Sequence, residues 1–170
     1  MLSKVIYSGI EMKHTITVAE VQGIALDRES QLPIVLLKTS HPGRIIPIPV
    51  GPSEASAIIV EVEKVHPPRP LTHDLIAELF HRHNFSLLYS EIRDRIEDTY
   101  TAFIHYRRHF RKHSMEVRPS DAIALALRME APIHINPLLL AEAEHSLDVF
   151  RHLHGDDILL LEPDYRDHAV

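Results

Sequence analysis

The chain has 170 residues, of which 45% are hydrophobic and 25% are charged, and its formal net charge is −6. These values fit one globular domain, and the acidic balance argues against a protein that coats nucleic acid through bulk charge. Because the sequence contains no cysteine, disulfide bonds, thiolate catalysis and cysteine-bound metal centres are excluded. We find neither a signal-peptide pattern nor an apolar run of membrane-spanning length, so we expect a cytoplasmic protein without membrane contact.

Three strands are predicted in the first fifty residues, over 4–10, 32–37 and 45–50, with the first continuing through 15–18. The second is almost continuously apolar, which favours an internal position in a sheet. The third contains two prolines, which cannot donate to a strand ladder. We therefore expect the third strand to be short or to lie at an edge.

Two helices are predicted next, on either side of a proline-rich connector over 66–70. The first opens at Ser53, and its apolar residues recur at helical spacing. The second runs from 73 to 83, with Thr72 as its N-cap.

Residues 85–92 and 99–106 predict two antiparallel strands, and the basic segment 107–113 follows them. A charge run of this kind favours a solvated loop, with phosphate contact as the alternative. Three histidines in this region recur at every fourth residue, namely His105, His109 and His113. Four residues of strand span roughly 13 Å, too far for a shared metal ion, so solvated histidines are expected.

A buried helix is predicted from Ser120 to Arg128, because residues 122–127 are apolar on every side. A short strand over 132–135 and a short helix over 137–145 follow. Strands and helices interleave without strict alternation, which favours an α+β fold with a mixed, largely antiparallel sheet and helices packed on it. We expect one compact domain over 1–145, and a tail over 146–170 that packs on the domain or on a partner.

Three helix openings carry polar residues that could form one site. They are Ser53-Glu54, Thr72-His73-Asp74 and Ser120-Asp121, and Arg-Pro pairs at 69–70 and 118–119 precede the last two. Carboxylates with a histidine suit a divalent cation that activates water, and arginines can hold a phosphate. The alternative is that each opening is only a helix cap, with Arg–Asp pairs tying loops to helices. A Ser/His/Asp hydrolase is disfavoured, because neither Ser53 nor Ser120 lies in a Gly-x-Ser-x-Gly turn.

Three sequence blocks resemble the bifunctional nuclease family, in matching order and spacing. They are 46–51 with Glu54 and Ala55, 69–75, and 118–128 with 131–133. The resemblance covers roughly residues 5 to 140, and it implies a compact α+β domain, often a homo-oligomer, whose members are credited with cleaving DNA and RNA. Glu116 stands where that family usually has aspartate.

Our leading hypothesis is a nuclease-family domain that hydrolyses phosphodiester bonds in DNA, RNA or both. Its candidate catalytic residues are His73, Asp74, Ser120 and Asp121; its candidate phosphate ligands are Arg69 and Arg118; and its candidate ligands for Mg²⁺ or Mn²⁺ are Glu54, Asp74 and Asp121. A homo-oligomer, of which a dimer is the simplest form, is expected. The alternative hypothesis is a non-catalytic oligomeric module, in which the polar openings stabilise the fold or bind a small anion.

Overall fold

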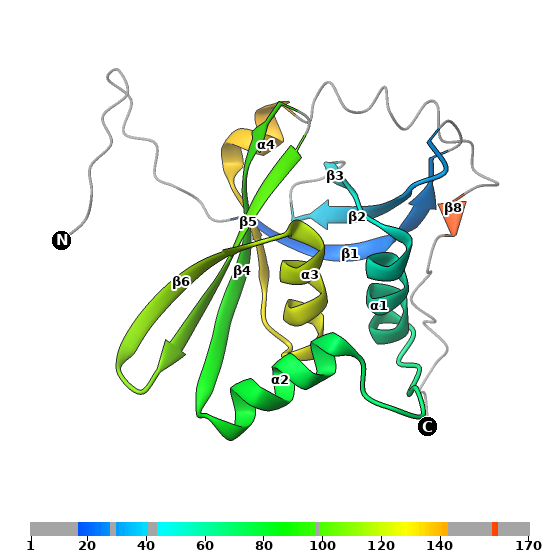
Figure 1. Ribbon diagram of the computed structural model, residues 1–170. Helices are drawn as coiled ribbons and strands as arrows, with labels where there is room; N and C mark the ends of the chain where they lie inside the picture. Colours follow the sequence, from blue (N-terminus) through cyan, green and yellow to red (C-terminus); the bar gives the residue numbers. More distant parts are fainter. Residues whose placement is uncertain (1–16, 28–29, 41–43, 98, 143–157, 160–170) are drawn as a thin grey trace, which may run out of the picture.

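The computed structural model describes residues 17–27, 30–40, 44–97, 99–142 and 158–159. Within these residues the chain forms one mixed sheet, and helices α1, α2 and α3 pack together on one of its faces (Figure 1). This arrangement confirms the predicted α+β class.

The sheet consists of two antiparallel meanders joined by one short strand. The first meander contains β1 (Thr17–Leu26), β2 (Pro33–Thr39) and β3 (Ile45–Pro49). The second contains β4 (Phe85–Ile96), β5 (Thr99–Arg108) and β6 (Arg111–Val117). Strand β7 (Ile133–Ile135) lies between them, antiparallel to β1 and parallel to β4, and β8 (Ile158–Leu159) pairs with β1.

The strand order along the sheet is β3-β2-β1-β7-β4-β5-β6. Strand β3 is therefore an edge strand and β2 is internal, as their proline content and apolar character predict. The other edge is β6, whose side chains from Arg111 to Glu116 are all exposed.

The helices are α1 (Pro52–Val62), α2 (Thr72–Arg82), α3 (Pro119–Arg128) and the short α4 (Pro137–Glu142). Helix α3 is the centre of the core, because residues 122–126 are all buried and α3 packs against both α1 and α2. Buried Ser90 of β4 donates a hydrogen bond of 2.8 Å from its hydroxyl to the carbonyl of Ala122, which fixes the first turn of α3 on the sheet. This agrees with the predicted buried helix.

Three local predictions differ from the structure. Strand β1 extends to Leu26, well beyond the predicted end at 18, because a register shift between Val21 and Gly23 breaks the alternation that marks a strand. The basic segment expected as a loop forms the end of β5, a tight turn and the start of β6. Helix α2 has Leu71 as its N-cap in place of Thr72, since the Asp74 carboxylate accepts the Leu71 amide at 2.6 Å.

Some predictions concern other parts of the chain. The strand expected over 4–10 and most of the tail over 146–170 lie outside the described residues. No helix in the described ranges is long and apolar enough to cross a membrane.

Candidate functional site

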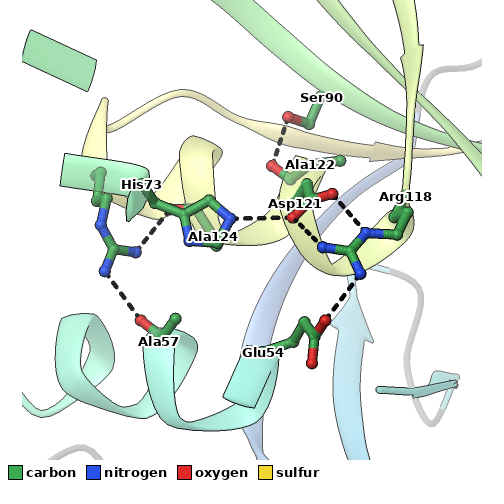
Figure 2. A network of polar contacts seen from close by, with 9 residues as sticks. Glu54, Ala57, His73, Ser90, Arg118, Asp121, Ala122 and Ala124 are labelled. Carbon is green, nitrogen blue, oxygen red and sulfur yellow. Dashed lines mark hydrogen bonds and ion pairs between the residues drawn. The ribbon is translucent and has the colours of Figure 1, made fainter. Parts of the chain in front are cut away.

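A cleft of about 1080 Å³ opens between the three helices and the β5–β6 hairpin. Its walls include apolar side chains of α2, α3 and the hairpin, such as Ile76, Phe80 and Leu125. Its ionisable members are Glu54, His73, Arg118 and Asp121, which come from the N-terminal ends of α1, α2 and α3 (Figure 2).

Each of these helices opens in the same way, with an acidic residue three positions after the N-cap. The N-caps are Gly51, Leu71 and Arg118, and the acidic residues are Glu54, Asp74 and Asp121. Negative charge in a first turn is stabilised by the free amides and the helix dipole, so an acidic residue at each of these positions is explained by helix stability alone. The direction in which each carboxylate points depends on which cationic side chain lies close enough to pair with it.

Arg118 joins α1 to α3 across the cleft. Its Nε and Nη2 donate to the two carboxylate oxygens of Asp121 at 2.8 and 3.1 Å, and its Nη1 donates to Glu54 Oε1 at 2.8 Å. The guanidinium has five N–H donors. These three bonds use one donor on each nitrogen, so one N–H on each Nη stays available, and the side chain is 65% exposed.

His73 is held by the same carboxylate. Its Nε2 lies 3.1 Å from Asp121 Oδ1, and the residue is buried. Burial alone would raise the pKa of Asp121, but the hydrogen bonds and charges of Arg118 and His73 outweigh it and hold that pKa below its usual value. An ionised carboxylate only accepts hydrogen bonds, so His73 donates from Nε2, and in the neutral imidazole Nδ1 is then the acceptor.

Asp74 forms a separate ion pair with Arg128, away from the cleft. Burial raises the pKa of Asp74, but the Leu71 amide and the Arg128 guanidinium together hold it below its usual value. Arg128 is only 3% exposed in its side chain, and it also donates to the carbonyls of Ala124 and Ala57 at 3.1 Å. This pair therefore ties α1, α2 and α3 together.

The structure brings together some of the predicted site residues and separates others. Glu54, His73, Arg118 and Asp121 share the cleft. Asp74 and Ser120 do not line it, and Ser120 is buried in the first turn of α3. Arg69 is exposed, does not line the cleft, and forms no hydrogen bond or ion pair with the described residues.

The three carboxylates predicted as metal ligands do not converge. Glu54 and Asp121 both face the Arg118 guanidinium, whereas Asp74 faces Arg128. Within the described ranges, no three side chains of His, Asp or Glu are grouped so that they could hold one ion. This arrangement does not fit Glu54, Asp74 and Asp121 as three ligands of one ion. A role for Mg²⁺ or Mn²⁺ in this protein stays a prediction.

A second polar cluster, which the sequence reading missed, lies on the sheet face opposite the helices. The Tyr89 ring stacks between the rings of His105 and His134, with centroid distances of 4.2 and 4.5 Å. His105 Nε2 also lies 2.8 Å from Glu91 Oε2, so the prediction of a solvated His105 is wrong. The signal was the alternation along β4, since Tyr89 and Glu91 point away from buried Ser90.

Comparison with known proteins gives one family and several relatives. The model of the bifunctional nuclease domain matches residues 35–148, a range that includes every residue of the cleft. An uncharacterized protein of Mycobacterium tuberculosis (strain H37Rv) is 40% identical over 123 residues, 72% of this chain and 73% of that protein. Bifunctional nuclease 2 of Oryza sativa subsp. japonica is 24% identical over 119 residues, 68% of this chain but only 37% of the rice protein. Bifunctional nuclease 1 of Oryza sativa subsp. indica is 24% identical over 106 residues, 61% of this chain and 32% of that protein.

Proposed function

Since the chain belongs to the bifunctional nuclease domain family, we propose that it hydrolyses phosphodiester bonds of DNA, RNA or both in the cleft between α1, α2 and α3. One observation carries the proposal: the Arg118 guanidinium, with two N–H donors available, lies beside the His73–Asp121 pair. A guanidinium that binds phosphate and an oriented general base can together support phosphodiester hydrolysis.

The proposed reaction assigns one role to each cleft residue. The available N–H groups of Arg118 bind the non-bridging oxygens of the phosphate. His73 Nδ1 takes a proton from the attacking water as the new O–P bond forms, and the leaving oxygen takes a proton from solvent in the open cleft. Asp121 orients the imidazole and stabilises its charged form, while Glu54 holds the guanidinium in place.

Matched variants test these roles. We expect His73→Gln to lower kcat on single-stranded DNA and RNA by about 10²- to 10⁴-fold, the usual contribution of a positioned general base. Asp121→Asn should cause a loss of similar order. His81→Gln is the control, because His81 is exposed on the same helix and does not line the cleft. Full activity of His73→Gln, with contaminating nuclease excluded by parallel mock purification, would refute the proposal.

Assistance by Mg²⁺ or Mn²⁺ is a separate part of the proposal, and no step above depends on it. The same assay in excess EDTA tests it. A loss of activity that Mn²⁺ or Mg²⁺ restores would support a metal role, and undiminished activity would remove it.

The second candidate function is non-catalytic, and the Asp74–Arg128 pair favours it. This pair is an Arg–Asp link between helices with a structural role, and Arg118 could bind a small anion without catalysis. The cleft would then bind inorganic phosphate in a calorimetric titration, Arg118→Gln would abolish that binding, and purified protein would cleave neither DNA nor RNA.

The proposal also includes self-association, with a dimer as the simplest form. Within the described residues, β3 and β6 are the free edges at which a second copy could extend the sheet. Sedimentation equilibrium of the full chain measures the oligomeric mass directly, and a monomer at micromolar concentration would contradict this part.

A further inference from the structure

The β5–β6 hairpin carries an unneutralised concentration of positive charge. Two cations precede its turn and two follow it, namely Arg107, Arg108, Arg111 and Lys112. In the part of the chain that the structure describes, none of the four forms an ion pair with a carboxylate. This group of cations is a local exception in a chain whose formal net charge is −6.

The strand register places these cations opposite one another. Arg107 faces Lys112, and Arg108 faces Arg111. Because successive strand residues point to opposite faces, Arg108 and Arg111 lie on one face of the hairpin and Arg107 and Lys112 on the other. Like charges directly opposite each other destabilise a strand pair. Repulsion between these cations therefore opposes the pairing of β5 with β6, and a bound polyanion would reduce this repulsion.

One face of the hairpin continues the wall of the cleft. Val117 and Met115 of β6 line the cleft, and the alternation of side chains puts His113 and Arg111 on the same face. The His113 ring stacks on Tyr106 of β5 with centroids 5.3 Å apart. A track of apolar, ring and cationic side chains thus leads about 20 Å from Val117 to Arg111.

The turn of the hairpin presents an aromatic ring to solvent. Phe110 is 101% exposed, so it contributes nothing to the core. His109 beside it has a φ of 54°, a left-handed conformation that non-glycine residues seldom adopt. An exposed ring next to cations is what single-stranded nucleic-acid sites use, because rings stack on bases while cations bind phosphates.

We propose that the β5–β6 hairpin, Thr99–Val117, is a docking arm that binds single-stranded nucleic acid and leads the strand into the cleft. The proposal rests on the proposed function for the direction of delivery, while binding itself is measured without cleavage. A stacked strand rises about 3.4 Å per nucleotide, so the track accommodates about six nucleotides between the turn and the cleft. Figure 1 shows the hairpin extending away from α3 at the edge of the sheet, where a strand can approach it.

Fluorescence anisotropy of a fluorescein-labelled dT20 oligonucleotide, with the full chain in EDTA, tests the binding. Phe110→Ala should raise Kd about tenfold, the effect of one lost base-stacking contact. Arg108→Gln with Arg111→Gln should lower the slope of log Kd against log salt by about 0.7 for each lost phosphate contact. Lys38→Gln with Lys64→Gln removes the same charge elsewhere and should bind like wild type.

Arg111→Glu separates binding from folding. It places a carboxylate opposite Arg108, so we expect a higher Tm together with weaker dT20 binding. Unchanged binding by Arg111→Glu and Phe110→Ala would overturn the proposal. So would binding of wild-type protein to phosphatidylglycerol vesicles without any binding to dT20.

Cleavage assays distinguish this proposal from the proposed function. If both hold, Arg108→Gln with Arg111→Gln lowers kcat/KM at least tenfold more for a 20-nucleotide substrate than for a dinucleotide. If His73→Gln alone loses cleavage and the hairpin variants bind dT20 like wild type, the docking arm is wrong and the nuclease stands. If the hairpin variants lose dT20 binding and wild-type protein cleaves nothing, the docking arm stands and the nuclease is wrong.

Discussion

At the scale of single residues, the same helix position has two different roles in this protein. Asp121 and Asp74 occupy equivalent places in α3 and α2, and each contacts an arginine. The Arg118 side chain is mostly exposed, so the Asp121 pair remains open to solvent and to a ligand. The Arg128 side chain is buried, so the Asp74 pair is a structural link. The environment of each guanidinium, and not the carboxylate itself, separates the candidate site from the scaffold.

We predict that Asp74→Asn lowers the free energy of unfolding by about 3 kcal/mol at neutral pH, because it leaves the buried Arg128 guanidinium without a negative counter-charge. The pKa of Asp74 is lower in the folded state than its usual value. The stabilisation is therefore fully present above the unfolded pKa of about 3.9 and is lost as the pH falls through the folded pKa.

Urea unfolding of both proteins from pH 7 down to pH 2 measures this difference. Glu78→Gln is the control, because it removes the exposed partner of Arg82 on the same helix and should change stability little. A difference between wild type and Asp74→Asn that stayed constant over the whole pH range would contradict the assignment.

At the scale of elements, α3 depends on small side chains. Ala122, Ala124 and Ala126 are completely buried, and α3 packs against both α1 and α2. Small residues let neighbouring helices approach closely, so the spacing of α3 from its neighbours sets the separation of Glu54, His73 and Asp121. The geometry of the cleft therefore depends on the packing of α3 as well as on the residues that line the cleft.

We predict that Ala126→Leu lowers the free energy of unfolding by about 1–3 kcal/mol through overpacking. Chemical denaturation measures it, with Ala141→Leu on the exposed side of α4 as a control that should change little. Equal stabilities of wild type and Ala126→Leu would show that α3 can move apart from its neighbours without cost.

The sequence predicts elements whose residues carry a local signal. The uninterrupted apolar run behind Asp121 is enough to place α3 in the core, and two prolines place β3 at an edge. Strand β6 gives no such signal, because all but its last side chain are exposed and only pairing with β5 makes it a strand. The grouping of Glu54, His73 and Asp121 was a hypothesis from helix openings, and the exclusion of Asp74 depends on Arg128, a contact 54 residues away in sequence.

At the scale of the whole molecule, a three-residue strand holds the sheet together. The two meanders have extensive antiparallel pairing of their own, but β7 joins them through three residue pairs with β1 and three with β4. The pairing with β4 is parallel, and no other pairing among the described strands is. The connection between the two meanders is thus less extensive than the strand pairing within either of them.

We predict that native-state hydrogen exchange resolves two cooperative groups of amides, one in β1 and β2 and the other in β4 and β5. Ile135→Ala, which removes a buried side chain of β7, should lower the free energy of unfolding by about 3 kcal/mol and increase exchange in β7 first. A single opening free energy shared by all four strands would contradict this division.

The position of β7 also has a consequence for the time at which the cleft forms during synthesis. Glu54 belongs to the first meander and its helix, whereas Arg118 and Asp121 follow the second, and the joining strand ends only at Ile135. A ribosome must therefore translate past Asp121 before these groups can meet, and past Ile135 before β7 can join the two meanders. If the cleft cleaves RNA, the nascent chain cannot do so before Asp121 has left the exit tunnel.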